Sequence, residues 1–207
     1  GENQANGEIT IKREGMAVVN YLLPLQLGHC SNESIICRDE VCYLRVGRTY
    51  TNPIISDKSV PDPSVIRAND GYFYLYATQT KTYWMPVYRS KDLVNWEYQG
   101  TAFNKATEPD LPGGGAFWAP EIRFLNGKYV LYYSWAKMNG ADISYTAVAV
   151  GDTPMGPFLD SKELIGNKEF GSNCIDQFYY EEDGKKYMFF GSFKGIYVTE
   201  LEDDGLT

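Results

Sequence analysis

The chain has 207 residues, of which 43% are hydrophobic and 15% aromatic, enough to bury a core as a single domain. Its formal net charge of −8 argues against nucleic-acid partners, because phosphate binding needs a basic surface, but it does not oppose a neutral polymer such as a plant glycan. A single histidine, His29, excludes a His-rich metal site, and the four cysteines show no zinc spacing. Carboxylates must therefore carry any acid–base chemistry.

The first 50 residues form an N-terminal segment to which the sequence assigns no role. Their longest apolar stretch, residues 16–27, contains two polar residues and a proline and is too short to cross a bilayer. We interpret this stretch as part of a strand pair, with a weak export signal as the alternative. A Cys37–Cys42 loop and fully reduced thiols, with Cys174 buried, are both open.

Residues 51–207 contain a repeat of roughly 56 residues, a period typical of propellers and solenoids. Each copy reads as an apolar strand, an Asn/Asp-Gly turn and an aromatic-rich strand, which together predict a β-hairpin. The turn glycines Gly71, Gly127 and Gly184 are separated by 56 (71 to 127) and 57 (127 to 184) residues. The three copies span 66–78, 123–134 and 180–192.

A further alternating strand follows each hairpin, at 85–100, 144–160 and 195–205. Three to four strands per repeat without helical periodicity predict an all-β propeller blade, and the regular period favours this over a β-sandwich. Propellers close with about four to eight blades. We therefore expect residues 51–207 to hold the first three blades of a domain whose other blades lie outside this chain.

Three carboxylates are expected to face the axis of this propeller. The first strands begin at "DPSVIR" (62), "APEIRF" (119) and "IDQFYY" (175), and such strands line the central channel. Asp62 and Asp176 lie nine and eight residues before the turn glycine of their repeats, and Glu121 lies two residues out of step. Clustered carboxylates separate their pKa values and so favour acid–base work. The alternatives are a strand-end cap for Asp176 and a structural or substrate-binding role for Glu121.

Two aromatic residues next to a glycine-rich loop are candidate sugar contacts. Phe117 and Trp118 follow "PGGGA", and glycines allow a ligand to approach closely. Core packing is the ordinary role of a single aromatic side chain. Of the two, Trp118 is the side chain that we expect to contact a ligand.

These motifs resemble glycoside hydrolase family 43, the five-bladed β-propeller arabinanases and xylosidases. The resemblance covers about residues 50–207, and "GSFKGIYVTEL" (191–201) is most similar to the endo-1,5-α-L-arabinanase branch. The motifs that carry it are "YTNPI…VPDPSVI" (50–66), "YRSKDLVNWEYQG" (88–100), "FWAPEI" (117–122) and "NCIDQFYYEEDGKKYMFFGSF" (173–193).

The resemblance implies a role for each candidate. It makes Asp62 the general base and Asp176 the carboxylate that tunes the pKa of the acid. The family's general acid is a glutamate in a later blade, so none is expected in this chain, and Glu200 is a poor substitute. Gln177 departs from the family, in which proline often follows the second aspartate. The implied substrate-binding residues are Phe117, Trp118, Glu121, Asn173 and Ser192.

The implied reaction is hydrolysis of arabinan, or of another arabinose- or xylose-containing plant polysaccharide, with inversion at the anomeric carbon. Many members carry an axial cation, often calcium, held partly by a histidine that this stretch lacks. We expect no nucleic-acid partner, no membrane span and a secreted or periplasmic location. The alternatives are a non-catalytic carbohydrate-binding propeller and a propeller with a purely structural role.

Overall fold

The computed structural model describes residues 52–56, 58–112, 115–137, 144–166, 170, 174–192 and 194–207, and the backbone alone of 21–26, 41–46 and 140–143. The chain divides into two compact units, residues 1–51 and 52–207. In the first unit, β1 (Tyr21–Gln26) and β2 (Val41–Val46) pair antiparallel, as the sequence predicts for the apolar stretch. Within the described residues no helix has the length and hydropathy of a membrane span. His29, Cys30 and Cys37 lie outside the described residues.

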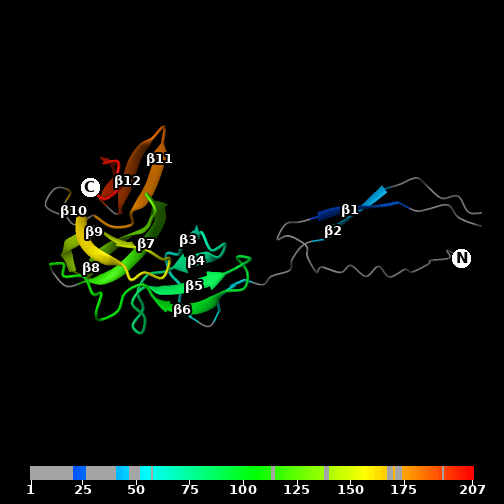
Figure 1. The fold of residues 1–207 in the computed structure, drawn as a ribbon, viewed down its shortest axis with the longest axis horizontal. Coiled ribbons are helices and arrows are strands. Elements are labelled where there is room, and N and C mark those ends of the chain that lie inside the picture. Colours follow the sequence, from blue (N-terminus) through cyan, green and yellow to red (C-terminus); the bar gives the residue numbers. More distant parts are fainter. Residues whose placement is uncertain are drawn as a thin grey trace, which may run out of the picture. The chain divides into compact units, whose positions relative to one another are not determined.

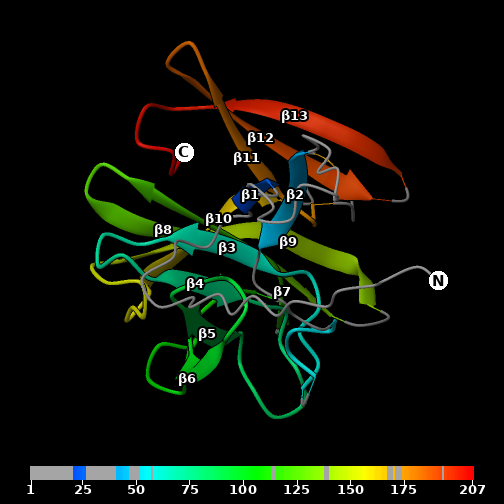
Figure 2. The same cartoon turned by 90° about the vertical axis from the view of Figure 1, so that its right-hand side faces the viewer.

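The second unit contains three antiparallel sheets, which confirms the predicted blades. Figures 1 and 2 both show the sheet of blade 2 between those of blades 1 and 3. Blade 1 is β3 (Ser64–Arg67), β4 (Phe73–Tyr76), β5 (Pro86–Ser90) and β6 (Glu97–Thr101). Blade 2 is β7 (Ala116–Leu125), β8 (Lys128–Lys137), β9 (Gly140–Gly151) and β10 (Leu159–Gly166). Blade 3 is β11 (Phe178–Glu182), β12 (Lys185–Ser192) and β13 (Gly195–Leu201).

All three predicted hairpin turns are present, but they differ in length. In blades 2 and 3 the turn has two residues, both with positive φ, as in Asn126 (49°) and Gly127 (80°). In blade 1 only Gly71 (84°) has positive φ, and the loop between Ala68 and Tyr72 has three residues. The extra residue explains why Asp62 lies nine residues before its turn glycine and Asp176 only eight.

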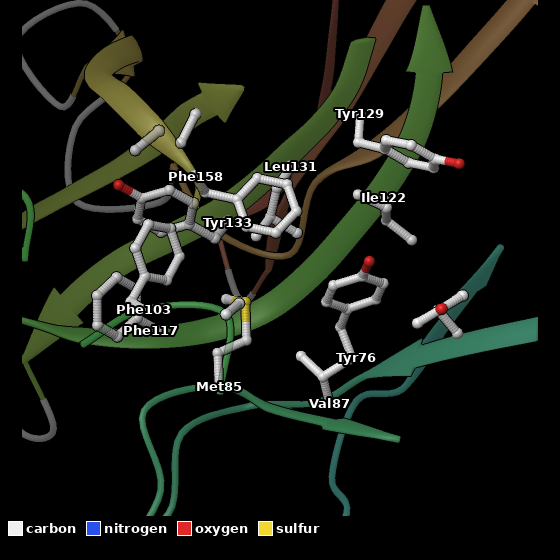
Figure 3. Close-up of a cluster of buried hydrophobic side chains, with 14 of the residues drawn as sticks. Tyr76, Met85, Val87, Phe103, Phe117, Ile122, Tyr129, Leu131, Tyr133 and Phe158 are labelled. Atoms are coloured by element: carbon white, nitrogen blue, oxygen red, sulfur yellow. The ribbon is translucent and has the colours of Figure 1, made fainter. Parts of the chain in front are cut away.

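The main hydrophobic cluster joins blade 1 to blade 2, and Figure 3 shows its central side chains. Tyr76 and Val87 come from blade 1, and Leu131 and Tyr133 come from blade 2; all four are fully buried. The ring of Phe117, on β7, stacks on the ring of Phe103 with 4.3 Å between centroids. A second cluster, which includes Cys174, joins blade 2 to blade 3. Each blade is therefore held by burial of apolar surface against its neighbour.

Candidate active site

In each blade, one residue in the first strand or two residues before it has a left-handed backbone. These residues are Asp62 (φ 50°), Ala119 (φ 41°) and Asp176 (φ 57°), each 57 residues from the next. In blade 2 the bulge is the register shift between Trp118 and Glu121. The backbone amides of Thr78 and Gly191 donate to Pro61 and Ile175 across the corresponding bulges of blades 1 and 3. Bulges re-aim side chains and are frequent beside active sites.

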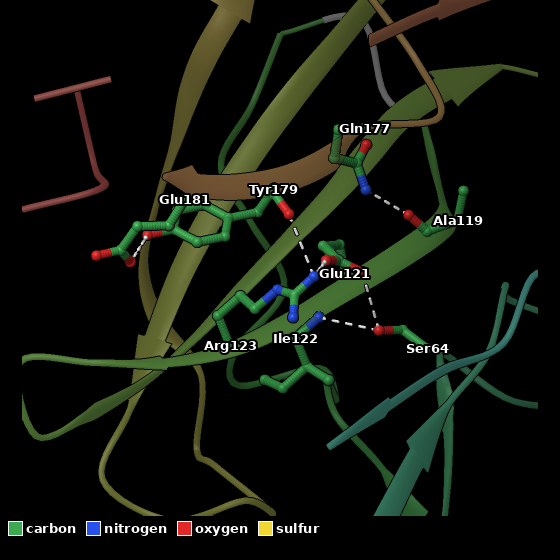
Figure 4. Close-up of polar contacts among 8 residues, drawn as sticks. All are labelled: Ser64, Ala119, Glu121, Ile122, Arg123, Gln177, Tyr179 and Glu181. Atoms are coloured by element: carbon green, nitrogen blue, oxygen red, sulfur yellow. Dashed lines mark hydrogen bonds and ion pairs between the residues drawn. The ribbon is translucent and has the colours of Figure 1, made fainter. Parts of the chain in front are cut away.

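The blade 2 counterpart of the two aspartates is therefore Ala119, and Glu121 lies two residues after it, which agrees with the offset of two expected from the residue count. Glu121 corresponds to Ser64, 57 residues earlier, since each lies two residues after the left-handed residue of its blade. Its side chain is only 12% exposed, forms an ion pair with Arg123 (Nη2–Oε1, 2.5 Å) and accepts a hydrogen bond from Ser64 Oγ (3.1 Å). Arg123 in turn donates to the backbone carbonyl of Tyr179 (3.2 Å), so these side chains link three first strands (Figure 4).

Asp62 and Asp176 lie at equivalent positions of blades 1 and 3, and their carboxyl groups interact. Both residues are exposed, and the hydroxyl of Thr78 donates to Asp62 Oδ2 (2.7 Å). Desolvation raises the pKa of the Asp176 carboxyl, and the negative charge of Asp62 raises it further. The two carboxylates that the sequence singled out, 114 residues apart (62 to 176), therefore lie near enough for the charge of one to affect the pKa of the other.

Two hydroxyl groups support these positions, and sequence reasoning missed both. Thr78 and Ser134 each lie seven residues after the turn glycine of their repeat. Thr78 Oγ1 accepts a hydrogen bond from the backbone N–H of Ala119 (2.7 Å), and Ser134 Oγ accepts one from the N–H of Asp176 (3.0 Å). Each hydroxyl therefore ties its blade to the left-handed residue of the next blade. The shared offset of seven residues is the signal that could have identified them.

Gln177 occupies the position at which blades 1 and 2 have Pro63 and Pro120. It is buried, its Oε1 accepts from Ser134 Oγ (2.9 Å), and its Nε2 donates to the carbonyl of Ala119 (Figure 4). The departure from proline thus adds a side-chain link between blades 2 and 3 beside Asp176.

The two candidate sugar contacts on β7 face in different directions. Phe117 is 2% exposed and packs on Phe103, so its ring has no free face for a sugar, and its prediction as a substrate contact is wrong. Successive side chains of a strand point to opposite faces. Trp118 is accordingly only partly buried, and it lies next to Ala119 at the bulge. Trp135, by contrast, is buried with its ring edge against Phe117 (5.1 Å).

For the remaining predicted site residues, no hydrogen bond to Asp62 or Asp176 is seen among the described residues. Ser192 ends β12, one residue after Gly191, whose amide donates to the carbonyl of Ile175 (2.8 Å) beside Asp176. Asn173 lies outside the described residues. Glu200, on β13, is exposed and pairs with Lys185 (3.2 Å).

The calcium ion that the resemblance allows stays an expectation for the described residues. Among them, no group of three or more His, Cys, Asp or Glu side chains is arranged to hold a metal ion. We therefore assign no step to a cation.

Comparisons with known proteins agree with this geometry. Residues 50–207 match the family model described as "Glycosyl hydrolases family 43". A putative β-xylosidase of Escherichia coli is 30% identical over 68% of the chain, and a probable arabinan endo-1,5-α-L-arabinosidase of Aspergillus fumigatus is 29% identical over 73%. An α-L-arabinanase of Cellvibrio cellulosa, solved with arabinohexaose, superposes with a TM-score of 0.60 at 30% identity over 73% of the chain.

The matches cover these proteins only in part. The chain spans 26% of the Escherichia coli protein, 48% of the Aspergillus fumigatus protein and 50% of the crystallised arabinanase chain. The solved relatives are five-bladed propellers, and the described unit contains three such blades.

Proposed function

Because the chain belongs to family 43 of the glycosyl hydrolases, we propose that it provides two of the catalytic carboxylates of an inverting glycosidase that acts on arabinan. Asp62 is the general base, and Asp176 tunes the pKa of the acid. The observation that carries this proposal is the pairing of Asp62 with Asp176. They occupy the same bulge position in two blades, and the charge of one raises the pKa of the other.

The proposed reaction is a single displacement. Asp62 removes a proton from a water molecule, which attacks the anomeric carbon while an acid protonates the departing oxygen. Inverting enzymes hold the base and the acid about 6.5–9.5 Å apart, which leaves room for the water. Thr78 occupies Oδ2 of Asp62, so we assign the water to Oδ1. We assign no residue of this chain as the acid.

Asp176 contributes through its charge rather than by bond making. A second carboxylate near the acid favours the protonated form of that acid by like-charge repulsion. Its own pKa is raised by partial desolvation and by the charge of Asp62, so like-charge repulsion already acts at this position.

Two observations support arabinan as the substrate. Relatives named for arabinan or arabinose are frequent among the matches, and one was solved with arabinohexaose. Trp118, one residue before Ala119, is partly exposed, and such a ring can stack on a sugar. The net charge of −8 does not oppose such a neutral polymer. A polysaccharide such as arabinan is too large to enter the cytoplasm intact, so we also propose that the protein is secreted or periplasmic.

The test is hydrolysis of arabinan and of xylan by the full-length protein and by its Asp62→Asn variant. We expect arabinan to be cleaved with inversion, and Asp62→Asn to lower turnover about 10²- to 10⁴-fold while folding is kept. Asp183→Asn is the matched control, since Asp183 is also a left-handed aspartate (φ 51°) but lies in a hairpin turn. Near-normal activity of the Asp62→Asn variant would show that Asp62 is not the general base. Sugar binding without hydrolysis would favour the carbohydrate-binding propeller, and preferred cleavage of xylan would correct the substrate.

A further inference from the structure

We propose that Thr78 is the positioning residue that sets the orientation of the Asp62 carboxylate, by linking it to a hydrogen-bond chain that crosses blade 2 to Asp176. This inference rests on the proposed function for its catalytic consequence. Its structural content, that Thr78 holds Asp62 in place, can be tested without activity.

The direction of each hydrogen bond at Thr78 follows from counting protons. A threonine hydroxyl has one proton and two acceptor lone pairs. The backbone N–H of Ala119 can only donate, so Thr78 Oγ1 accepts it (2.7 Å). The single hydroxyl proton is then left for Asp62 Oδ2 (2.7 Å). Asp62 is therefore held by a donor whose own orientation is fixed by the backbone of the neighbouring blade.

The chain continues from Ala119 to Asp176. The carbonyl of Ala119 accepts a hydrogen bond from Gln177 Nε2, and Gln177 Oε1 accepts one from Ser134 Oγ (2.9 Å). Ser134 Oγ accepts in turn from the N–H of Asp176 (3.0 Å). Both the N–H and the carbonyl of Ala119, the left-handed residue of blade 2, are thus hydrogen-bonded. Figure 4 shows the hydrogen bond from Gln177. The chain connects the Asp62 carboxylate to the Asp176 backbone.

The hydroxyls of Thr78 and Ser134 accept equivalent hydrogen bonds but donate to different groups. This difference allows a structural role to be told from a catalytic one. Both accept an amide N–H from the next blade, and this contact ties the blades together. Ser134 gives its proton to another structural group, Gln177, whereas Thr78 gives its proton to a proposed catalytic carboxylate. Only at Thr78 does loss of the hydroxyl reach the reacting groups directly.

The catalytic test compares Thr78→Val, which keeps the shape but removes the hydroxyl, with Thr78→Ser, which keeps the hydroxyl. In the full-length protein acting on arabino-oligosaccharides, we expect Thr78→Val to lower kcat about 10- to 100-fold with KM changed less than about twofold. Thr78→Ser should restore kcat to within about threefold of the wild-type value. Thr101→Val is the matched control, because Thr101 also donates to a single oxygen, the carbonyl of Phe103 (2.8 Å), but on the outermost strand of blade 1.

A double variant separates positioning from a general loss of structure. If Thr78 acts through Asp62, Thr78→Val should add less than about twofold to the loss caused by Asp62→Asn. Additive losses, or equal losses in Thr78→Val and Thr101→Val, would overturn the proposal.

A readout that needs no hydrolysis distinguishes failure of this inference from failure of the proposed function. The charge of Asp62 raises the pKa of Asp176, so that pKa reports where the Asp62 carboxylate lies. In an NMR titration, Thr78→Val should move the Asp176 pKa and Thr78→Ser should leave it in place. Such a result in a protein without glycosidase activity would keep the positioning role and reject the function. An unmoved pKa would reject the positioning role. If Thr78→Val does not fold, Thr78→Ala, which leaves space for a water, takes its place.

Discussion

Asp92 and Asp176 lie at opposite ends of their blades, and the fold shifts their pKa values in opposite directions. Asp92 follows β5, near the hairpin turn of blade 1, whereas Asp176 lies at the end that carries Asp62. Burial raises the pKa of Asp92, but hydrogen bonds from Asn95, Val94 and Ser90 outweigh burial and hold that pKa well below its usual range. At Asp176 burial acts in the same direction as the charge of Asp62, and the pKa rises.

The difference agrees with a structural role for Asp92 and with the role proposed for Asp176. Asp92 caps its own turn, since its Oδ1 accepts from the amides of Val94 (3.0 Å) and Asn95 (2.8 Å). Such a carboxylate is stabilised as an anion by its neighbours. Asp176 is kept near a like charge at a desolvated position, which costs stability and is typical of functional sites. Phe117 and Trp118 differ in the same way, one serving the core and its neighbour facing outward.

The largest expected change in the free energy of unfolding is at Phe117. Phe117→Ala removes a fully buried ring from the main cluster and should lower the free energy of unfolding by about 3–5 kcal/mol. Trp118→Ala should cost about 1–2 kcal/mol but weaken arabino-oligosaccharide binding about tenfold, because it removes the stacking face. Chemical denaturation and calorimetric titration measure the two quantities. A larger stability loss for Trp118→Ala than for Phe117→Ala would reverse their assignments.

A smaller effect is expected at the turn of blade 1. Asp92→Ala leaves the amides of Val94 and Asn95 without their acceptor and should lower the free energy of unfolding by about 1–3 kcal/mol at neutral pH. Because the folded-state pKa is lowered, this stability is present above the ordinary pKa of about 3.9 and is lost as the pH falls toward the folded-state pKa. Denaturation at pH 7 and pH 3 tests this. A loss that grows on acidification would contradict it.

The repeat made the blades predictable, because hairpin turns and strand alternation are local in sequence. The axial site was predicted less completely. Counting from the turn glycine placed Glu121 two residues out of step but did not identify Ala119 as the true counterpart, since the three-residue loop of blade 1 and the bulge between Trp118 and Glu121 are invisible in a residue count. The aspartates themselves were identified because they share a repeat position. Thr78 and Ser134 were missed because their partners lie 41 and 42 residues away in the next blade, and only the packing of the blades shows those contacts.

Asp176→Asn should raise stability at neutral pH, by less than Asp92→Ala lowers it. A raised folded-state pKa means that Asp176 contributes stability below its ordinary pKa and that this contribution is lost as the pH rises through the folded-state value. Asparagine removes the desolvated charge, and it tolerates the left-handed backbone (φ 57°). The gain should vanish in acid, where Asp176 is neutral. Melting temperatures at pH 7 and pH 3 measure it, and a variant less stable than wild type at pH 7 would show that the Asp176 charge is structural.

The smallest effect concerns the pKa of Asp176 when Asp62 loses its charge. Asp62→Asn should lower that pKa, because the like charge is removed, but not to its usual value, because desolvation is the larger cause. An NMR titration of the Asp176 carboxyl measures the shift, and Asp183→Asn, which alters a distant turn, is the control. If the pKa does not move, the two carboxylates do not share one pocket and Asp176 cannot act on a common acid. A fall to the usual value would mean that Asp62 alone perturbs Asp176 and that the axial end of the blades is well hydrated.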